Sequence, residues 1–176
     1  MPYRSNYNQN LPKVQSEFEE KIIQVNRVSK KTKGGNRSSF SVLMVVGDRK
    51  DRLGVGLGKA TEVSSAVVKA TTYAKKHLIT IPLKGNTIPH EVYVKLGAAK
   101  VLLKPAPPGA GVIAGGTVRT VIGVTGIRDI VSKCLGTKNK ASNVYATMEA
   151  LKKLRILADR NIGTRDQKTE TNNIDR

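Results

Sequence analysis

The sequence predicts an α+β protein of two lobes, the first of order β-β-β-α and the second of order β-β-α-β-α. Strand-like apolar runs alternate with short polar turns between residues 21 and 59, and helical periodicity follows at residues 62–79. A segment with proline at both ends and Gly-Asn between them then precedes a second series of apolar runs. We therefore expect a first lobe over residues 17–81, a linker at 82–89 and a second lobe over 90–158.

The first lobe is expected to open with three antiparallel strands. Residues 18–28 combine near-helical spacing with strand-like alternation, and we predict a strand over residues 21–29. Two more strands, at 39–47 and 53–59, are joined by the polar turn 48–51. These three strands form an antiparallel meander.

Glycines 54, 56 and 58 share one parity of the third strand, so one of its faces carries hydrogens instead of side chains. A glycine face of this kind indicates that something packs there closely. The helix at 62–79 is amphipathic and is expected to cover this sheet, followed by a short strand at 79–82. Its predicted inner side carries Val63, Ala66, Val67, Ala70, Tyr73, Ala74 and Leu78.

The second lobe is expected to begin with a hairpin, in which strands at 91–96 and 100–104 flank the turn Gly97-Ala-Ala. Apolar spacing then predicts a short helix at 114–123 and a strand at 129–133. A final helix is expected to be capped at Ser142 or Asn143. Its predicted inner face carries Val144, Met148, Leu151 and Leu154.

Positive charge dominates the composition. The 176 residues include 31 Lys and Arg against 13 Asp and Glu, which gives a net charge of +18. Such a chain is expected to bind polyanions, nucleic acid first and a membrane surface second. No apolar run approaches the roughly 18 residues needed to span a bilayer, and no basic amphipathic helix dominates the cationic count. We therefore expect nucleic acid as the partner and no membrane.

Little in the sequence indicates catalysis or metal binding. A single Cys134 excludes an internal disulfide, which fits a reducing compartment. His77 and His90 lack suitable partners for a metal site. We expect no enzyme activity, metal, cofactor or small-molecule substrate. The polar ends, residues 1–16 and 159–176, are expected to be flexible tails. We expect no signal segment.

The most informative stretch is the basic segment 27–37, which holds five cationic side chains, two adjacent glycines and no carboxylate. With no local partner for its charge, it is expected to contact a phosphate backbone through Lys, Arg and the N–H groups of its glycine turn. Only 4% of residues are aromatic, which argues against base stacking as the main mode. The predicted RNA-binding residues are Arg27, Ser29, Lys30, Lys31, Lys33, Gly34, Gly35, Asn36, Arg37, Arg52, Lys59, Lys69, Lys75 and Lys76.

Two glycine patterns support an alternative hypothesis, a nucleotide-dependent enzyme. The series at 54–59 imitates a phosphate-binding loop, but Leu53 and Ala60 stand where that motif needs glycine and Ser or Thr. Residues 109–114 satisfy a dinucleotide pattern, but the prolines at 105–108 spoil the strand-to-helix turn. Nucleotide binding without RNA would favour the enzyme. A free-standing double-stranded-RNA-binding module is a third hypothesis, and it leaves the second lobe unexplained. For the lysines at 69–76 the alternative is a merely solvated helix face.

Short motifs in both lobes carry a family resemblance. They are residues 25–30 (VNRVSK), 33–35 (KGG), 45–48 (VVGD), 54–60 (GVGLGKA), 62–63 (EV), 104–106 (KPA), 111–116 (GVIAGG) and Arg119. In order and spacing, from about residue 18 to residue 154, the chain resembles the bacterial-type fifth protein of the small ribosomal subunit. Ser38, Ala110 and the pair Pro107-Pro108 depart from the usual pattern of that family.

The resemblance implies a structural protein whose first lobe, residues 17–81, is similar to a double-stranded-RNA-binding domain and whose second lobe is α+β. It also implies that both lobes dock on small-subunit rRNA and that a basic loop lies near the spectinomycin site. It also implies contacts with the fourth and eighth small-subunit proteins, a position near the mRNA entry path, stabilisation of head and body geometry, and a part in translational accuracy. The expected location is the cytoplasmic ribosome of a bacterium, with an organellar ribosome as the alternative. By the same resemblance the protein-partner contacts fall on Gly109, Gly111, Gly115, Gly116 and Arg119.

Overall fold

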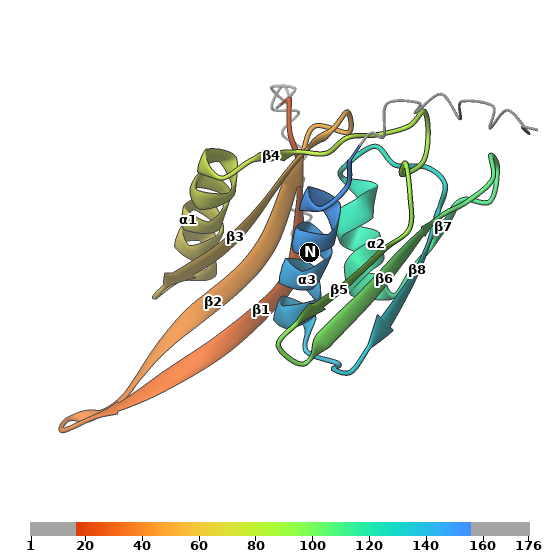
Figure 1. Cartoon of the computed structure of the whole chain (residues 1–176). Helices are drawn as coiled ribbons and strands as arrows, with labels where there is room; N and C mark the ends of the chain where they lie inside the picture. Colours follow the sequence, from red (N-terminus) through yellow and green to blue (C-terminus); the bar gives the residue numbers. More distant parts are fainter. Residues whose placement is uncertain (1–16, 156–176) are drawn as a thin grey trace, which may run out of the picture.

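Residues 17–155 are described by a computed structural model, in which helices and sheets alternate in four layers (Figure 1). One helix covers the outer face of the first sheet, and two helices lie between the first sheet and the second. The first sheet is antiparallel with strand order β1-β2-β3-β4. Its elements are β1 (Glu19–Thr32), β2 (Gly35–Gly47), β3 (Arg52–Ala60), the covering helix α1 (Val63–Lys76) and β4 (Ile79–Thr80).

The second sheet has strand order β5-β6-β8-β7, in which only β7 and β8 run parallel. Its elements are β5 (Val92–Leu96), β6 (Ala99–Pro105), β7 (Val112–Ile113), α2 (Gly116–Gly123), β8 (Ile130–Leu135) and α3 (Lys140–Lys152). The predicted α+β class and its two sheet-and-helix lobes are therefore confirmed. The two-residue β7 was not predicted, because so short a strand has no periodicity to detect.

The close neighbour predicted for the glycine face of β3 is the backbone of α1. A Cβ atom added to Gly54, Gly56 or Gly58 would lie 2.3, 2.0 or 2.1 Å from a carbonyl oxygen of that helix. Only hydrogen fits at such distances, so the prediction of close packing is confirmed. The carbonyl oxygen belongs to Ala74 for Gly54, to Ala70 for Gly56 and to Ala66 for Gly58.

The helix that covers the sheet is shorter than predicted, and fewer of its side chains are buried. It ends at Lys76, where the N–H of His77 donates to the carbonyl oxygen of Ala74 at 3.1 Å. Its buried side chains are only Ala66, Ala70 and Ala74. Val63 and Tyr73, placed on the inner side by periodicity, are 37% and 50% exposed. The backbones approach too closely for larger side chains to enter, so these two side chains remain at the margins of the contact.

The N-terminus of α3 also differs from the prediction. Asn139, not Ser142 or Asn143, caps the helix, and its Oδ1 accepts a hydrogen bond of 3.0 Å from the N–H of Ala141. Asn143 lies one turn into the helix and is buried, and its Nδ2 donates to the carbonyl oxygen of Thr137. The inner face was predicted correctly: Val144 and Leu151 are fully buried, Leu154 is 4% exposed, and Met148 packs against the core.

One hydrophobic core joins the two sheets. Leu43, Val45, Leu53 and Val55 on the inner face of the first sheet belong to the same buried cluster as the apolar side chains of α2, α3 and the second sheet. The connecting segment 81–91 is anchored in it, because Ile81 and Ile88 are each 1% exposed. The first sheet is therefore held at a fixed position on the rest of the molecule.

Candidate RNA-binding surface

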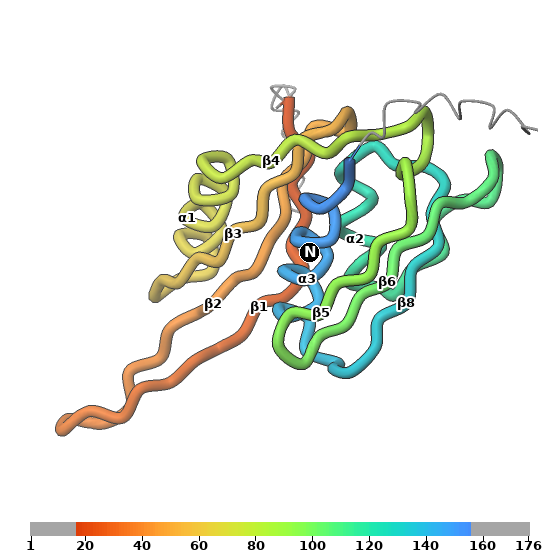
Figure 2. Tube along the Cα trace, viewed as in Figure 1, coloured from red at the N-terminus to blue at the C-terminus, as the bar shows by residue number. Residues whose placement is uncertain are grey.

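β1 and β2 extend well beyond the other strands as a two-stranded hairpin (Figure 2). Pairing between β2 and β3 begins only at Phe40 opposite Ala60, so residues 28–39 pair with each other and with no third strand. At the tip the Thr32 hydroxyl donates to the carbonyl oxygen of Gly35 at 2.7 Å, and Gly35 has a φ of +123°. Glycine tolerates that conformation without strain.

The predicted basic loop at 27–37 is therefore an ordered hairpin arm, and the prediction that the first strand ends at residue 29 is wrong. β1 continues to Thr32, and only Lys33 and Gly34 lie between the strands. Charge misled the prediction. The backbone ladder needs only N–H and C=O groups, so the cationic side chains can project into solvent from a paired strand.

The five cations of the hairpin arm lack acidic partners. Arg27, Lys30, Lys31, Lys33 and Arg37 are all exposed, and none forms an ion pair within residues 17–155. No Asp or Glu occurs between residues 21 and 47. Lys30 and Arg37 are direct cross-strand partners, an arrangement that disfavours the isolated hairpin. An external polyanion would offset this repulsion.

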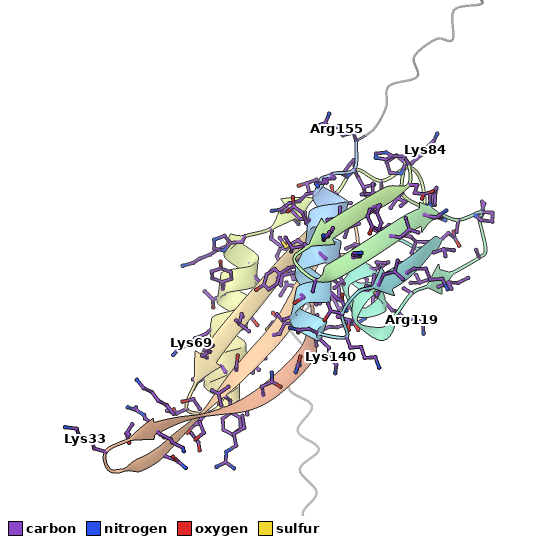
Figure 3. The ribbon with its side chains drawn as sticks, turned by 60° about the horizontal axis from the view of Figure 1, so that its bottom comes forward. Lys33, Lys69, Lys84, Arg119, Lys140 and Arg155 are labelled. Carbon is purple, nitrogen blue, oxygen red and sulfur yellow. The ribbon has the colours of Figure 1, made fainter. Side chains whose placement is uncertain are left out.

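Two cations from other elements lie at the base of the arm. Lys59 of β3 and Lys69 of α1 line one groove together with Arg37. Lys33 lies at the tip of the arm and Lys69 lies on α1 at the same end of the molecule (Figure 3). The hairpin and this groove form what we call the basic arm surface, which brings together Arg27, Lys30, Lys31, Lys33, Arg37, Lys59 and Lys69.

The remaining predicted polar residues of the arm lie among these cations. Asn36 is paired with Lys31 and is exposed, and Ser29 is paired with Ser38. Gly34 and Gly35 have no atom within 4 Å of a would-be Cβ, so the turn is open to a close approach by a ligand. Arg27 donates from Nη2 to the Ser38 hydroxyl at 3.1 Å, which orients its guanidinium along the strand pair.

Arg52 and Lys75 are not brought together with the arm. Arg52 Nε lies 2.7 Å from Asp48 Oδ2, and Lys75 Nζ lies 2.9 Å from Glu20 Oε1. Both cations also lie over the ring of Phe18, at 5.1 and 5.8 Å from its centroid. These two predicted RNA ligands are thus engaged within the protein, whereas Lys76 at the end of α1 is exposed.

The carboxylates in this intramolecular network are held in the ionised form. Burial alone would raise the pKa of Asp48, but hydrogen bonds from Arg52 and from the N–H groups of Lys50, Asp51 and Arg52 hold that pKa well below its usual range. Hydrogen bonds from Arg49, followed by those from Lys21, lower the pKa of Glu19 to about 2. Charge in this region is therefore largely neutralised, in contrast to the arm.

The five residues predicted to contact partner proteins lie on the segment from the β6–β7 loop to α2. Gly109 and Gly111 have φ values of +87° and +72° and shape that loop. Gly115 precedes α2, and its carbonyl oxygen accepts from the N–H of Arg119 at 2.8 Å. Gly116 borders a groove between α2 and β1. The Arg119 side chain is exposed and forms no ion pair within the described residues (Figure 3).

Asp129 organises this loop and was missed as a site residue. Its Oδ1 accepts hydrogen bonds of 3.0 and 2.9 Å from the N–H groups of Gly109 and Gly111, and the residue is 5% exposed. In the sequence it was visible only as the single acidic residue between positions 92 and 148. This isolation was the signal that could have singled out Asp129, because an acidic residue that is alone in a basic lobe is a candidate for a structural role.

Neither glycine pattern forms a nucleotide site. The face of Gly54, Gly56 and Gly58 is filled by the backbone of α1, which leaves no space for a phosphate. In the second pattern the N–H groups of Gly109 and Gly111 already donate to Asp129. Within residues 17–155 there is no cluster of His, Cys, Asp and Glu that could hold a metal ion, and no helix there is long and apolar enough to cross a membrane.

A strongly basic α+β protein whose unpaired cations project on a hairpin has the features of a nucleic-acid-binding protein. Residues 18–82 match the sequence model of the ribosomal protein S5 N-terminal domain, and residues 94–161 match that of the ribosomal protein S5 C-terminal domain. The small ribosomal subunit protein uS5 of Thermus thermophilus is 49% identical over 145 residues, which cover 82% of this chain and 90% of that protein. Its counterparts in two individual strains of the same species give the same values. The chain belongs to the ribosomal protein S5 family, whose members are structural proteins and not enzymes.

Proposed function

We propose that this protein is a structural constituent of a bacterial small ribosomal subunit and binds rRNA through its basic arm surface. The observation that carries the proposal is the uncompensated charge of the arm: five exposed cations, no carboxylate between residues 21 and 47, and a like-charge pair at Lys30 and Arg37. Phosphates would remove the repulsion and accept hydrogen bonds from Lys, Arg and the open Gly34–Gly35 turn.

The shared core supports a mechanical role for this contact. The arm is continuous with β1 and β2, and β2 packs through Leu43 and Val45 into the core that also holds α2, α3 and the second sheet. RNA held by the arm is thereby placed at a fixed distance from whatever the second lobe contacts. By the family resemblance we propose that those contacts are the fourth and eighth small-subunit proteins, close to the mRNA path, and that Arg119 contributes to translational accuracy.

The proposal is tested by assembly. Small subunits reconstituted without their own S5-family protein are incubated with the wild-type chain or with a variant in which Lys30, Lys31 and Lys33 are replaced by Gln. We expect wild-type protein to sediment with the particle after a high-salt wash and the variant to be released. As a control, Lys50, Lys152 and Lys153 are replaced by Gln, which removes the same charge elsewhere. Equal retention of both variants would contradict the assignment to the arm.

A further inference from the structure

The second sheet has one face that no described helix covers. α2 and α3 pack on its inner face, and its other face is open (Figure 1). Cross-strand register assigns this open face, because directly paired residues share a side. Its central row runs from Tyr93 through Leu102 to Lys133. We call it the outer sheet face, and it consists of Tyr93, Lys95, Lys100, Leu102, Lys104, Ile113, Val131, Lys133 and Leu135.

Lysines on the outer sheet face are short of acidic partners. Lys95 and Lys100 are directly opposite each other, and Lys133 is the diagonal neighbour of Lys100. None of these three forms an ion pair within residues 17–155; only Lys104 does, with Glu91 at 3.2 Å. Like charges in direct register weaken a sheet. The outer sheet face thus shares with the arm a pair of like charges in direct register that have no acidic partner, although the two surfaces are far apart in the sequence.

Apolar groups lie among these lysines. Tyr93 is 54% exposed, and Ile113 and Leu135 are 52% and 50% exposed. A tyrosine on an open sheet face between lysines can stack on a nucleobase while the lysines contact the phosphates on either side. Unpaired RNA offers both groups, whereas the bases of a duplex are stacked inside it. An acidic protein would also satisfy these charges, and tyrosine is common at protein interfaces. The net charge of +18 and the ribosomal family of the chain favour RNA as the partner.

We propose that the outer sheet face is a second RNA-binding surface, specific for an unpaired segment, with Tyr93 stacking on one base and Lys95, Lys100 and Lys133 contacting its neighbouring phosphates. This inference rests on the proposed function only in naming RNA as the partner. It assigns a different lobe and a different form of RNA from the basic arm surface.

The experiment uses the full chain with Lys30, Lys31 and Lys33 replaced by Gln, so that the arm does not contribute. Its binding to an oligouridine of about ten nucleotides is measured over a salt series. We expect further replacement of Lys95, Lys100 and Lys133 by Gln to lower the affinity about ten-fold or more and to lower the salt slope by about two units, since each phosphate contact to a single strand contributes about 0.7. The same number of Gln replacements at Lys50, Lys152 and Lys153 should leave the slope unchanged.

Stacking is tested separately. Tyr93→Leu should weaken binding about five-fold or more with no change of salt slope, and Tyr93→Phe should bind as the parent does, because stacking needs the ring and not the hydroxyl. Amide chemical shifts should move in β5, β6 and β8 when the oligonucleotide is added. Circular dichroism melts confirm that each variant is folded.

Several outcomes would overturn the inference. Unchanged affinity and slope after the three lysine replacements would remove the face from RNA binding. Equal binding by Tyr93→Leu and Tyr93→Phe would refute the stacking contact. Normal RNA binding combined with loss of a neighbouring ribosomal protein from reconstituted particles would assign the face to an acidic protein instead. If the protein with only Lys30, Lys31 and Lys33 replaced by Gln binds duplex rRNA as tightly as wild type, the proposed function of the arm fails while this inference stands.

Discussion

The α-carbon of Gly56 on β3 faces the carbonyl oxygen of Ala70 on α1 so closely that a Cβ atom would lie 2.0 Å from it. The contact is between two backbones, so no flexible side chain can move aside to relieve it. The glycines that imitate a phosphate-binding loop are therefore the surface on which the helix packs. Helix and sheet would have to separate if any of the three carried a side chain.

Gly56→Ala is expected to lower the free energy of unfolding by about 1–3 kcal/mol, the usual cost of overpacking. The measurement is urea denaturation followed by circular dichroism. Gly34→Ala is the matched control, because no atom lies within 4 Å of its would-be Cβ and its φ needs no glycine. That control should change stability by no more than about 0.5 kcal/mol. Wild-type stability of Gly56→Ala would show that the helix is free to move away.

The ion pair of Glu19 with Arg49 predicts a specific pH dependence. The hydrogen bonds from Arg49 lower the pKa of Glu19 from 4.5 to about 2. Because the folded-state pKa is the lower one, the pair's contribution is fully present above about pH 4.5 and is lost as the pH falls through about 2. Glu19→Gln should cost about 0.5–1 kcal/mol at pH 7, since the pair is partly solvated. The difference from wild type should vanish near pH 2.

Urea denaturation of both proteins at several pH values between 7 and 2 checks this expectation. Glu149→Gln serves as a comparison, because Glu149 lies 4.0 Å from Lys152 in an exposed helix pair and should matter less. A Glu19→Gln defect of the same size at pH 7 and pH 2 would show that the loss is one of packing and not of charge.

Asp129 is expected to hold the β6–β7 loop in place. Asp129→Ala leaves the N–H groups of Gly109 and Gly111 without their acceptor and should destabilise the protein by about 1.5–3 kcal/mol. Hydrogen exchange at those two amides should accelerate more than elsewhere. Asp129→Asn retains one acceptor oxygen and should recover part of the loss. Unchanged exchange at both amides in the alanine variant would contradict this role.

Arg119→Glu should leave the isolated protein folded, with stability within about 0.5 kcal/mol of wild type, because the side chain is exposed and has no ion pair within residues 17–155. If the arginine contacts an acidic residue of a neighbouring ribosomal protein, the substitution should loosen that contact and raise codon misreading. A misreading reporter measures the effect, and Lys153→Glu is the charge-matched control. Unaltered accuracy in particles shown to contain the variant would count against Arg119.

The sequence was sufficient for those features that rest on a strong local pattern. Glycines 54, 56 and 58 at one parity predicted close packing, and the apolar spacing of Val144 and Leu151 predicted the inner face of α3. Local patterns were not sufficient where tertiary contacts or long-range strand pairing determine the structure. The cationic strand ends became an arm because β1 and β2 pair as far as Thr32 and Gly35, and no charge pattern reveals that register.

Tertiary packing also decided the details of the candidate site. Arg52 and Lys75 are as cationic in sequence as Lys59 and Lys69, but Asp48 and Glu20 engage the first two and leave the others on the basic arm surface. Asp129 lies some 20 residues from the loop it organises, so its partners could be found only once the fold had brought them together.

The central claim, that the basic arm surface binds the phosphate backbone of rRNA, is tested most directly by the salt dependence of affinity for a duplex rRNA fragment. The account predicts a steep linear fall of log affinity with log salt in wild type. Replacing Lys30, Lys31 and Lys33 by Gln should lower that slope by up to about three units, while the same replacement at Lys50, Lys152 and Lys153 leaves it unchanged. A slope that is the same in wild type and in the arm variant would contradict the claim.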